Sequence, residues 1–161
     1  MSVTLTTTLG ALKIELACET CPTLCANFLA HCGSGTYVGT KLHRVIPSFL
    51  VQGGDPTGTG KGGAAASGGT LQDEFSPTLR HAARGVVSMA NNGPDTNAAQ
   101  FFITFQPAPS LDDVYCVIGR VIGGMAVLDA IEAAKTGAKH RPLTDIVITG
   151  ATIHANPLAP V

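Results

Sequence analysis

A chain of 161 residues has the length of one domain, and 45% hydrophobic residues can build one sizeable core. The formal net charge is -1 and 13% of the residues are charged, so the chain offers no basic field to nucleic acid or an anionic membrane surface. No apolar run reaches the roughly 18 to 20 residues of a transmembrane helix, and the start MSVTL does not resemble a signal peptide. We expect one domain over residues 1–161 that works inside the cell, without direct nucleic-acid or membrane binding.

The first part of the chain predicts a hairpin and a helix. Residues 3–7 and 12–16 alternate apolar and polar side chains around the turn signal Gly10, which is typical of two strands with one buried face. Pro22 suits a first helical position, and apolar residues then recur at helical spacing up to Gly33. We expect a helix there with one apolar side.

Short strands dominate the rest of the chain. Residues 42–55 predict two strands bent at Pro47, and residues 58–69, of which six of twelve are glycine, predict a long mobile surface loop. A second helix is expected to follow Gly124. Further strands are expected at residues 85–90, 101–105, 114–118 and 146–153. Such a pattern favours a mostly β barrel or sandwich whose ends are covered by two helices, and the pattern alone does not choose between them.

Five cysteines make a poor disulfide framework, because their number is odd and Cys116 stands alone. Cys18 and Cys21 form a CxxC motif, which raises the alternatives of a zinc or a redox site. Cys25 and Cys32 follow on the apolar face of the expected helix and so should point into the core. This arrangement favours five free thiols, without a metal or any other cofactor.

Two common catalytic patterns fail on context. Gly58, Gly60 and Gly63 match GxGxxG, but no helix opens after them, and Lys61 is not followed by Ser or Thr as a phosphate-binding loop requires. GxSxG is absent and none of the five histidines lies in a recognisable triad motif. We expect neither a nucleotide site nor a hydrolase, and we expect His43 to be a structural, hydrogen-bonding residue.

The segment HRVIPSFLVQGGD places Arg44 and Gln52 at the two ends of an apolar run. Strands alternate their side chains, so a bend at Pro47 would put both polar residues on the side of Phe49, at the edge of an apolar cup. The alternative is that Arg44 is a solvated charge at a strand end and that the aromatic residues are only core. Spacing by itself favours this second interpretation.

A second segment, SMANNGPDTNAAQFFI, follows at residues 88–103, and with HRVIPSFLVQGGD it resembles the two signature segments of the cyclophilins, which are peptidyl-prolyl cis-trans isomerases. The resemblance runs from about Val3 to His154. Within the family, the Tyr115 position and the ending IHANP at residues 153–157 are most similar to the single-domain, spliceosome-associated isomerase-like 3 type. The resemblance implies a closed eight-stranded antiparallel β-barrel capped by two helices, and an isomerase that needs no cofactor.

The family's site residues can be carried over position by position. The resemblance implies Arg44, Gln52 and Phe49 as catalytic residues, with Arg44 donating to the twisted peptide. It implies a proline pocket and a segment that pairs with the substrate backbone, which together comprise Leu50, Ala90, Asn91, Asn92, Phe102, Ser110, Leu111 and Tyr115.

Three of these positions depart from the best-known members, because Leu50 replaces a common Met, Ser110 a common Trp and Tyr115 a common His. The changed rim predicts weak cyclosporin binding and favours a rival function, a module that binds proline segments in a larger assembly with incidental turnover. The expected partners are proline-containing peptides and proteins, including spliceosomal proteins. We expect a monomer in the nucleus, the cytoplasm or both.

Overall fold

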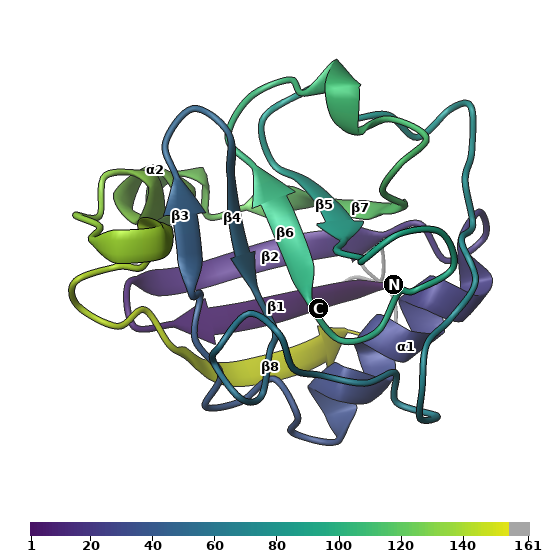
Figure 1. Cartoon of the computed structure of the whole chain (residues 1–161), viewed down its shortest axis with the longest axis horizontal. Helices are drawn as coiled ribbons and strands as arrows, with labels where there is room; N and C mark the ends of the chain where they lie inside the picture. Colours follow the sequence, from purple (N-terminus) through teal and green to yellow (C-terminus); the bar gives the residue numbers. More distant parts are fainter. Residues whose placement is uncertain (155–161) are drawn as a thin grey trace.

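The structure, a computed structural model, describes residues 1–154 and contains eight strands and two α-helices (Figure 1). Residues 155–157 of the IHANP ending, on which the isomerase-like 3 resemblance partly rests, lie outside the described residues. The strands are β1 (Ser2–Thr7), β2 (Gly10–Leu16), β3 (Arg44–Ile46), β4 (Leu50–Gly53), β5 (Val86–Met89), β6 (Phe101–Thr104), β7 (Val117–Gly123) and β8 (Ile148–His154). The helices are α1 (Pro22–Gly33) and α2 (Met125–Glu132), and two short 3-10 turns are η1 (Pro109–Leu111) and η2 (Ala138–His140).

The expected N-terminal hairpin and first helix are confirmed. In β1 and β2 the register pairs Val3 with Ile14 and Leu5 with Leu12, and all four side chains are buried. Alternation therefore brings the apolar residues of both strands to one face. Pro22 begins α1 within its first two positions, where a missing N–H costs nothing.

All eight strands form one antiparallel sheet in the order β3-β4-β6-β5-β7-β2-β1-β8. The sheet curves around the core, with α1 beside β8 and α2 at the opposite end (Figure 1). The expected closed barrel is wrong in one respect: within the described residues no ladder joins the edge strands β3 and β8, and the sheet is an open half-barrel.

The two edges meet through loop segments instead of strands. Gly39 N donates to Ile148 O at 2.7 Å, Leu42 N to Ile146 O at 2.8 Å, and Ile148 N to Thr40 O at 2.9 Å. Residues 39–42 precede β3, and their partners lie at and just before the start of β8. β3 is only three residues long and so offers little edge to continue a ladder.

The expected strand at residues 114–118 is also corrected, because β7 begins at Val117 and continues to Gly123. A turn occupies the missing positions: Asp113 has a φ of 61°, and Leu111 O accepts hydrogen bonds from the N–H groups of Val114 and Tyr115. The apolar letters of this stretch therefore belong partly to a turn that faces the candidate site.

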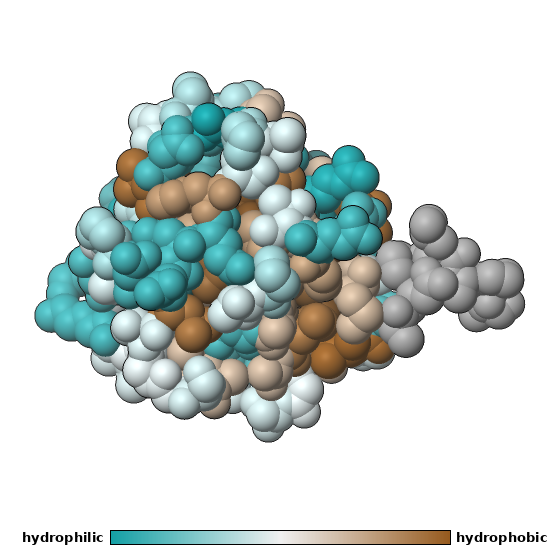
Figure 2. Space-filling view, turned by 90° about the vertical axis from the view of Figure 1, so that its right-hand side faces the viewer, coloured by the Kyte–Doolittle hydropathy of each residue, from teal (hydrophilic) through white to brown (hydrophobic). Residues whose placement is uncertain are grey.

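The surface has scattered apolar side chains. Exposed large hydrophobic residues include Leu9, Phe75, Ile122 and Leu143, which come from separate parts of the chain. On the face shown in Figure 2, hydrophobic atoms likewise reach the surface between hydrophilic ones. Within residues 1–154, no helix has the length and apolar character needed to cross a membrane.

Candidate active site

The β3–β4 hairpin places Arg44 directly opposite Gln52. The chain reverses at residues 47–49, where Ser48 takes a φ of 62° and Phe49 N donates to Ile46 O at 3.0 Å. The resulting register pairs Arg44 with Gln52, and the Arg44 Nη1 donates to Gln52 Oε1 at 3.2 Å. The predicted polar pair therefore exists, and it lies on one face of the sheet.

The next strand adds the apolar part of the site. Gln52 of β4 lies opposite Phe102 of β6, so the same face carries an arginine, a glutamine and an aromatic ring side by side. Phe102 belongs to a small apolar cluster with Leu50, Ala108 and Leu111, which is separate from the main core. Leu50 is 3% and Phe102 2% exposed. The predicted apolar cup thus corresponds to this cluster, which lies beside the polar pair of Arg44 and Gln52.

Tyr115 and Phe49 border this cluster. The rings of Tyr115 and Phe102 meet edge to face, with centroids 5.3 Å apart and planes at 87°. Such a geometry is favourable beyond the burial of area. Phe49, which is half-buried, packs against the cluster from the hairpin turn.

Ten of the eleven predicted site residues line one pocket of about 270 Å³. They are Arg44, Phe49, Leu50, Gln52, Ala90, Asn91, Asn92, Phe102, Leu111 and Tyr115. Ser110, the eleventh, is exposed on η1 and does not line this pocket. The structure thus brings together residues from four separate stretches of the chain, while their roles remain predictions.

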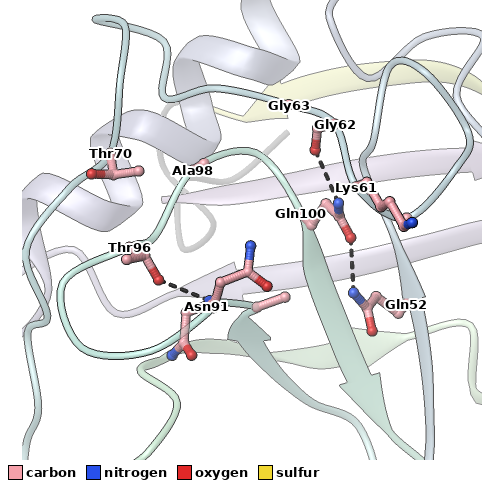
Figure 3. Close-up of a pocket in the computed structure, with 12 residues that line it drawn as sticks. Gln52, Lys61, Gly62, Gly63, Thr70, Asn91, Thr96, Ala98 and Gln100 are labelled. Atoms are coloured by element: carbon pink, nitrogen blue, oxygen red, sulfur yellow. Dashed lines mark hydrogen bonds between the residues drawn. The ribbon is translucent and has the colours of Figure 1, made fainter.

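Gln100, which sequence reasoning missed, connects the pair to the glycine-rich loop. Gln52 Nε2 donates to Gln100 Oε1 at 2.8 Å, and Gln100 Nε2 donates to Gly62 O at 2.9 Å (Figure 3). In both glutamines the amide oxygen points toward the Arg44 side and the amide nitrogen toward the glycine-rich loop. Gln100 lies two residues before Phe102, so the period of a strand was the signal that could have found it.

Gln52, Gln100 and Gly62 also line a second pocket of about 230 Å³ beside the first. It lies between residues 60–63 and residues 90–98, and it shares Gln52 and the residues 90–92 with the first pocket (Figure 3). The Asn91 Nδ2 donates to Val114 O at 2.8 Å, which fixes this amide at the border. An extended peptide could therefore continue from one hollow into the other.

The glycine-rich loop, whose Gly62 O accepts the hydrogen bond from Gln100, is itself hydrogen-bonded to the buried carboxylate of Asp55. Asp55 accepts hydrogen bonds from the N–H groups of Thr57, Gly60 and Gly62 and from the hydroxyls of Thr57 and Thr59. Burial alone would raise the pKa of Asp55, but these hydrogen bonds favour the charged form and lower the pKa to about 2. A Cβ at Gly62 would come within 2.5 Å of the Asp55 Oδ1, so a larger residue does not fit there.

Behind Phe102 lies a buried histidine, His81. Its ring stacks on Phe102 with centroids 5.8 Å apart, and its two nitrogens meet Ser88 Oγ at 2.6 Å and Asp112 Oδ1 at 2.7 Å. Burial lowers the pKa of His81, although Asp112 acts in the opposite direction. His81 therefore supports the floor of the cup as a satisfied polar residue.

The cysteines are free thiols, as expected, whereas the buried His43 does not show the expected hydrogen bonding, because its Nδ1 has no partner among the described residues. Cys25 and Cys32 are buried in the core, and burial raises the pKa of Cys21 to about 11 and that of Cys116 to about 12. These thiols are protonated and poorly nucleophilic at neutral pH. Within residues 1–154 no group of three His, Cys, Asp or Glu residues has the geometry to hold a metal ion.

Comparisons with known proteins agree with this geometry. The family model described as cyclophilin type peptidyl-prolyl cis-trans isomerase/CLD matches residues 2–153. A human protein named peptidyl-prolyl cis-trans isomerase-like 3 is 54% identical over 160 residues, which cover 99% of each chain, and an Arabidopsis thaliana peptidyl-prolyl cis-trans isomerase is 52% identical over 159 residues. A crystal structure of a Cryptosporidium parvum cyclophilin type isomerase, obtained in the presence of the dipeptide Ala-Pro, superposes with a TM-score of 0.94 at 42% identity. The superposition covers 97% of this chain and 100% of that one.

Proposed function

The chain belongs to the cyclophilin-type peptidyl-prolyl cis-trans isomerases and accelerates rotation about Xaa–Pro peptide bonds, and on this premise we propose that Arg44, held by Gln52, is its main catalytic group. The observation that carries the proposal is the guanidinium of Arg44 fixed at the edge of the apolar pocket that contains Phe102 and Leu50. The proline ring of the substrate occupies that pocket.

The chemistry needs stabilisation of a twisted peptide and no covalent step. The barrier to rotation is about 18 to 20 kcal/mol because the C–N bond has partial double-bond character. In the twisted state the nitrogen gains a basic lone pair and the charge separation of the planar amide falls. An apolar pocket therefore disfavours the planar state relative to the twisted one.

Arg44 adds a hydrogen bond that is stronger in the twisted state than in either planar state. A donor directed at the nitrogen or the neighbouring carbonyl meets this condition for catalysis. Arginine suits the task because it stays charged and its donors form a rigid fork, one arm of which is already bound by Gln52. Phe49, Phe102 and Leu111 hold the ring while the preceding carbonyl rotates.

Substitution of Arg44 tests the proposal. Arg44→Ala should lower kcat/KM for an Xaa–Pro peptide by roughly tenfold to a thousandfold, because a charged hydrogen bond is worth about 1.5 to 3 kcal/mol or somewhat more. The measurement is isomerisation by a coupled assay or by NMR exchange. Arg120→Ala is the matched control, since Arg120 lies on β7 with its side chain 69% exposed. An Arg44→Ala variant as fast as the parent would show that another group does the work.

A proline-binding module is the second candidate, and the rim favours it. Ser110 stands exposed on η1 and Tyr115 borders the cup, so the entrance differs from that of the best-known relatives while the cup itself is intact. Arg44→Ala separates the two functions in cells. A phenotype that needs only binding survives this substitution but not Phe102→Ala.

The biological setting is part of the proposal. We infer from the isomerase-like 3 resemblance a place in the nucleus or cytoplasm, where a monomer acts on proline-containing segments of splicing proteins. Imaging of the tagged full chain and its co-purification with spliceosomal proteins test this. A purely extranuclear location with no such partner would contradict the splicing role and leave the catalytic assignment intact.

A further inference from the structure

A basic pocket of about 300 Å³ opens beside the proline pocket and shares Arg44 and Gln52 with it. Lys139, His140 and Arg141 line its other side. No carboxylate is among the residues that line it. A substrate bound at the proline cup therefore has a concentration of positive charge within reach of its neighbouring residues.

The backbone that presents Lys139 and His140 is unusual. Residues 136–142 form a small hairpin in which Gly137 N donates to Arg141 O at 2.8 Å and Arg141 N donates to Ala138 O at 3.2 Å. Its central residues, Lys139 and His140, have φ angles of 58° and 57°, as in a type I′ turn. Asn and Gly normally occupy both positions, because other side chains are strained there. Two exposed basic residues in this turn suggest a role other than stability.

Arg141 fixes the hairpin against the glycine-rich loop. Its Nη1 donates to Gly58 O at 2.7 Å and its Nη2 to Thr59 O at 2.8 Å. These carbonyls do not neutralise the guanidinium. Within residues 1–154, the ion pairs formed include none with Arg44, Lys139 or Arg141.

The surrounding charges leave a net positive pocket. Asp55 is buried and its carboxylate is already engaged by five hydrogen bonds from residues 57–62. Lys41, which bridges to Asp55 along the backbone, pairs with Asp145 at 3.2 Å. His43, also in the pocket wall, has its pKa lowered by burial and is neutral at pH 7. Arg44, Lys139 and Arg141 therefore face the pocket as cations.

We propose that this basic pocket binds an anionic group, a carboxylate or a phosphate, on a substrate residue within about three positions of the isomerised proline. The proposal rests on the proposed function, because it assigns a substrate class to the same site. An extended chain covers about 3.3 to 3.6 Å per residue, so a neighbouring pocket with shared walls is reached within one to three residues. Guanidinium and ammonium groups bind carboxylate and phosphate oxygens with charge-assisted hydrogen bonds. The whole chain has a net charge of -1, which disfavours a nucleic-acid backbone as the source of the phosphate.

A peptide series tests the proposal. One Xaa–Pro peptide is made with Gln, Glu or phosphoserine at each position from the third before to the third after the proline. NMR exchange then gives kcat/KM for each. At low salt we expect Glu to exceed Gln by roughly twofold to tenfold at one or more positions, and the gain should shrink as salt is added. A gain with Glu and phosphoserine identifies acidic substrates in general, and a gain with phosphoserine alone identifies a phosphate ligand.

Variants of the hairpin supply the controls. Lys139→Asn/His140→Gly replaces both basic side chains with the residues that a type I′ turn favours, so the variant should melt at or above the parent temperature while its preference ratio falls toward one. Lys135→Gln removes one charge from the residue just before this hairpin, outside the pocket, and should keep the ratio.

Three outcomes would overturn the proposal. The first is no gain from Glu or phosphoserine at any position, and the second is a gain that persists in the double variant. If the Gln peptide is still isomerised in either case, only this inference is contradicted and the proposed function is not. The third is no turnover of any peptide, which contradicts the proposed function and this inference together.

Discussion

Gln100 is the residue that connects the proposed catalytic arginine to the rest of the fold. Its Oε1 accepts a hydrogen bond from Gln52 Nε2, and its own Nε2 donates to Gly62 O. The amide of Gln52 is therefore held with its oxygen toward Arg44. An unheld Gln52 could rotate and release the guanidinium. Gln100 thus acts as a positioning residue through Gln52.

Gln100→Leu should lower kcat by about twofold to tenfold, the value of one ordinary hydrogen bond, while KM changes less. Kinetics of both variants in a double-mutant cycle check the mechanism: in the Arg44→Ala background the second substitution should cost little. Gln106→Leu, at an exposed position, is the control. An equal loss in both backgrounds would mean that Gln100 acts independently of Arg44.

Ser110 predicts weak binding of cyclosporin. Well-studied relatives carry tryptophan at this position, and Ser110 is exposed on η1, next to Leu111 of the pocket. An aromatic side chain buries about 150 to 250 Å², so even a partial loss at roughly 25 cal/mol per Å² costs about 1 to 3 kcal/mol. Affinity should therefore be roughly tenfold to a hundredfold weaker than with tryptophan.

Calorimetric titration of Ser110→Trp should show that gain, with a modest effect on small-peptide turnover. Ser110→Phe is the matched variant, because it restores the apolar face without the indole N–H. Tight binding by the unmodified chain, or no gain from tryptophan, would place the rim elsewhere.

At the scale of elements, the glycine-rich loop is anchored more firmly than its composition suggests. Residues 58–69 were expected to form a mobile surface loop, yet Asp55 and Arg141 bind its first part and Asn27 Oδ1 accepts from Ala66 N at 2.8 Å. Glycine lets the backbone of the loop approach neighbouring groups closely, as Gly62 approaches the carboxylate of Asp55. This anchoring fixes the carbonyl on which Gln100 depends.

Asp55→Ala should lower the free energy of unfolding by about 1 to 3 kcal/mol, because buried N–H groups of the loop lose their acceptor. Urea unfolding measures the loss. Asp145→Ala is the control, since its exposed carboxylate pairs with Lys41 at the surface and should be worth less than about 1 kcal/mol. Equal effects of the two substitutions would mean that the loop does not depend on Asp55.

Local elements of this fold could be predicted from the sequence, whereas contacts between distant segments could not. Pro22 and the apolar spacing of α1, and the alternation of β1 and β2, are local signals, and both predictions are confirmed. The start of β7 depends on the turn at Asp113, which the apolar letters conceal. The open edge depends on how residues 39–42 meet residues 146–148, and no local pattern encodes that.

The same distinction holds for the site. The eleven site residues were placed by resemblance, and ten of them line one pocket, eight from the two signature segments together with Leu111 and Tyr115. Gln100 was missed because its value comes from Gln52 and Gly62, which are far away in sequence. The basic pocket was missed for the same reason, since Lys139 meets Arg44 only in the folded chain.

At the scale of the whole molecule, three buried histidines link folding to pH. His31, His43 and His81 are all buried, and burial lowers the pKa of each below the ordinary value of 6.5. The folded protein therefore holds these rings neutral, while the unfolded chain protonates them as pH falls through about 6.5. Below that pH the unfolded state binds more protons, so acid favours unfolding.

The free energy of unfolding should be constant above pH 7 and should fall as the pH drops from about 6.5 toward 5. Each histidine ring that stays neutral in the folded protein should lower it by up to about 1.4 kcal/mol per pH unit. This window lies above the range in which ordinary carboxylates titrate, so Asp55, with its pKa near 2, adds its own loss only at lower pH. Urea unfolding at pH 7.5, 6.5 and 5.5 measures the slope. His31→Gln should reduce it, because the buried ring of His31 packs against Tyr37 inside the core with centroids 5.1 Å apart. A stability independent of pH across this window would show that the rings gain protons without unfolding.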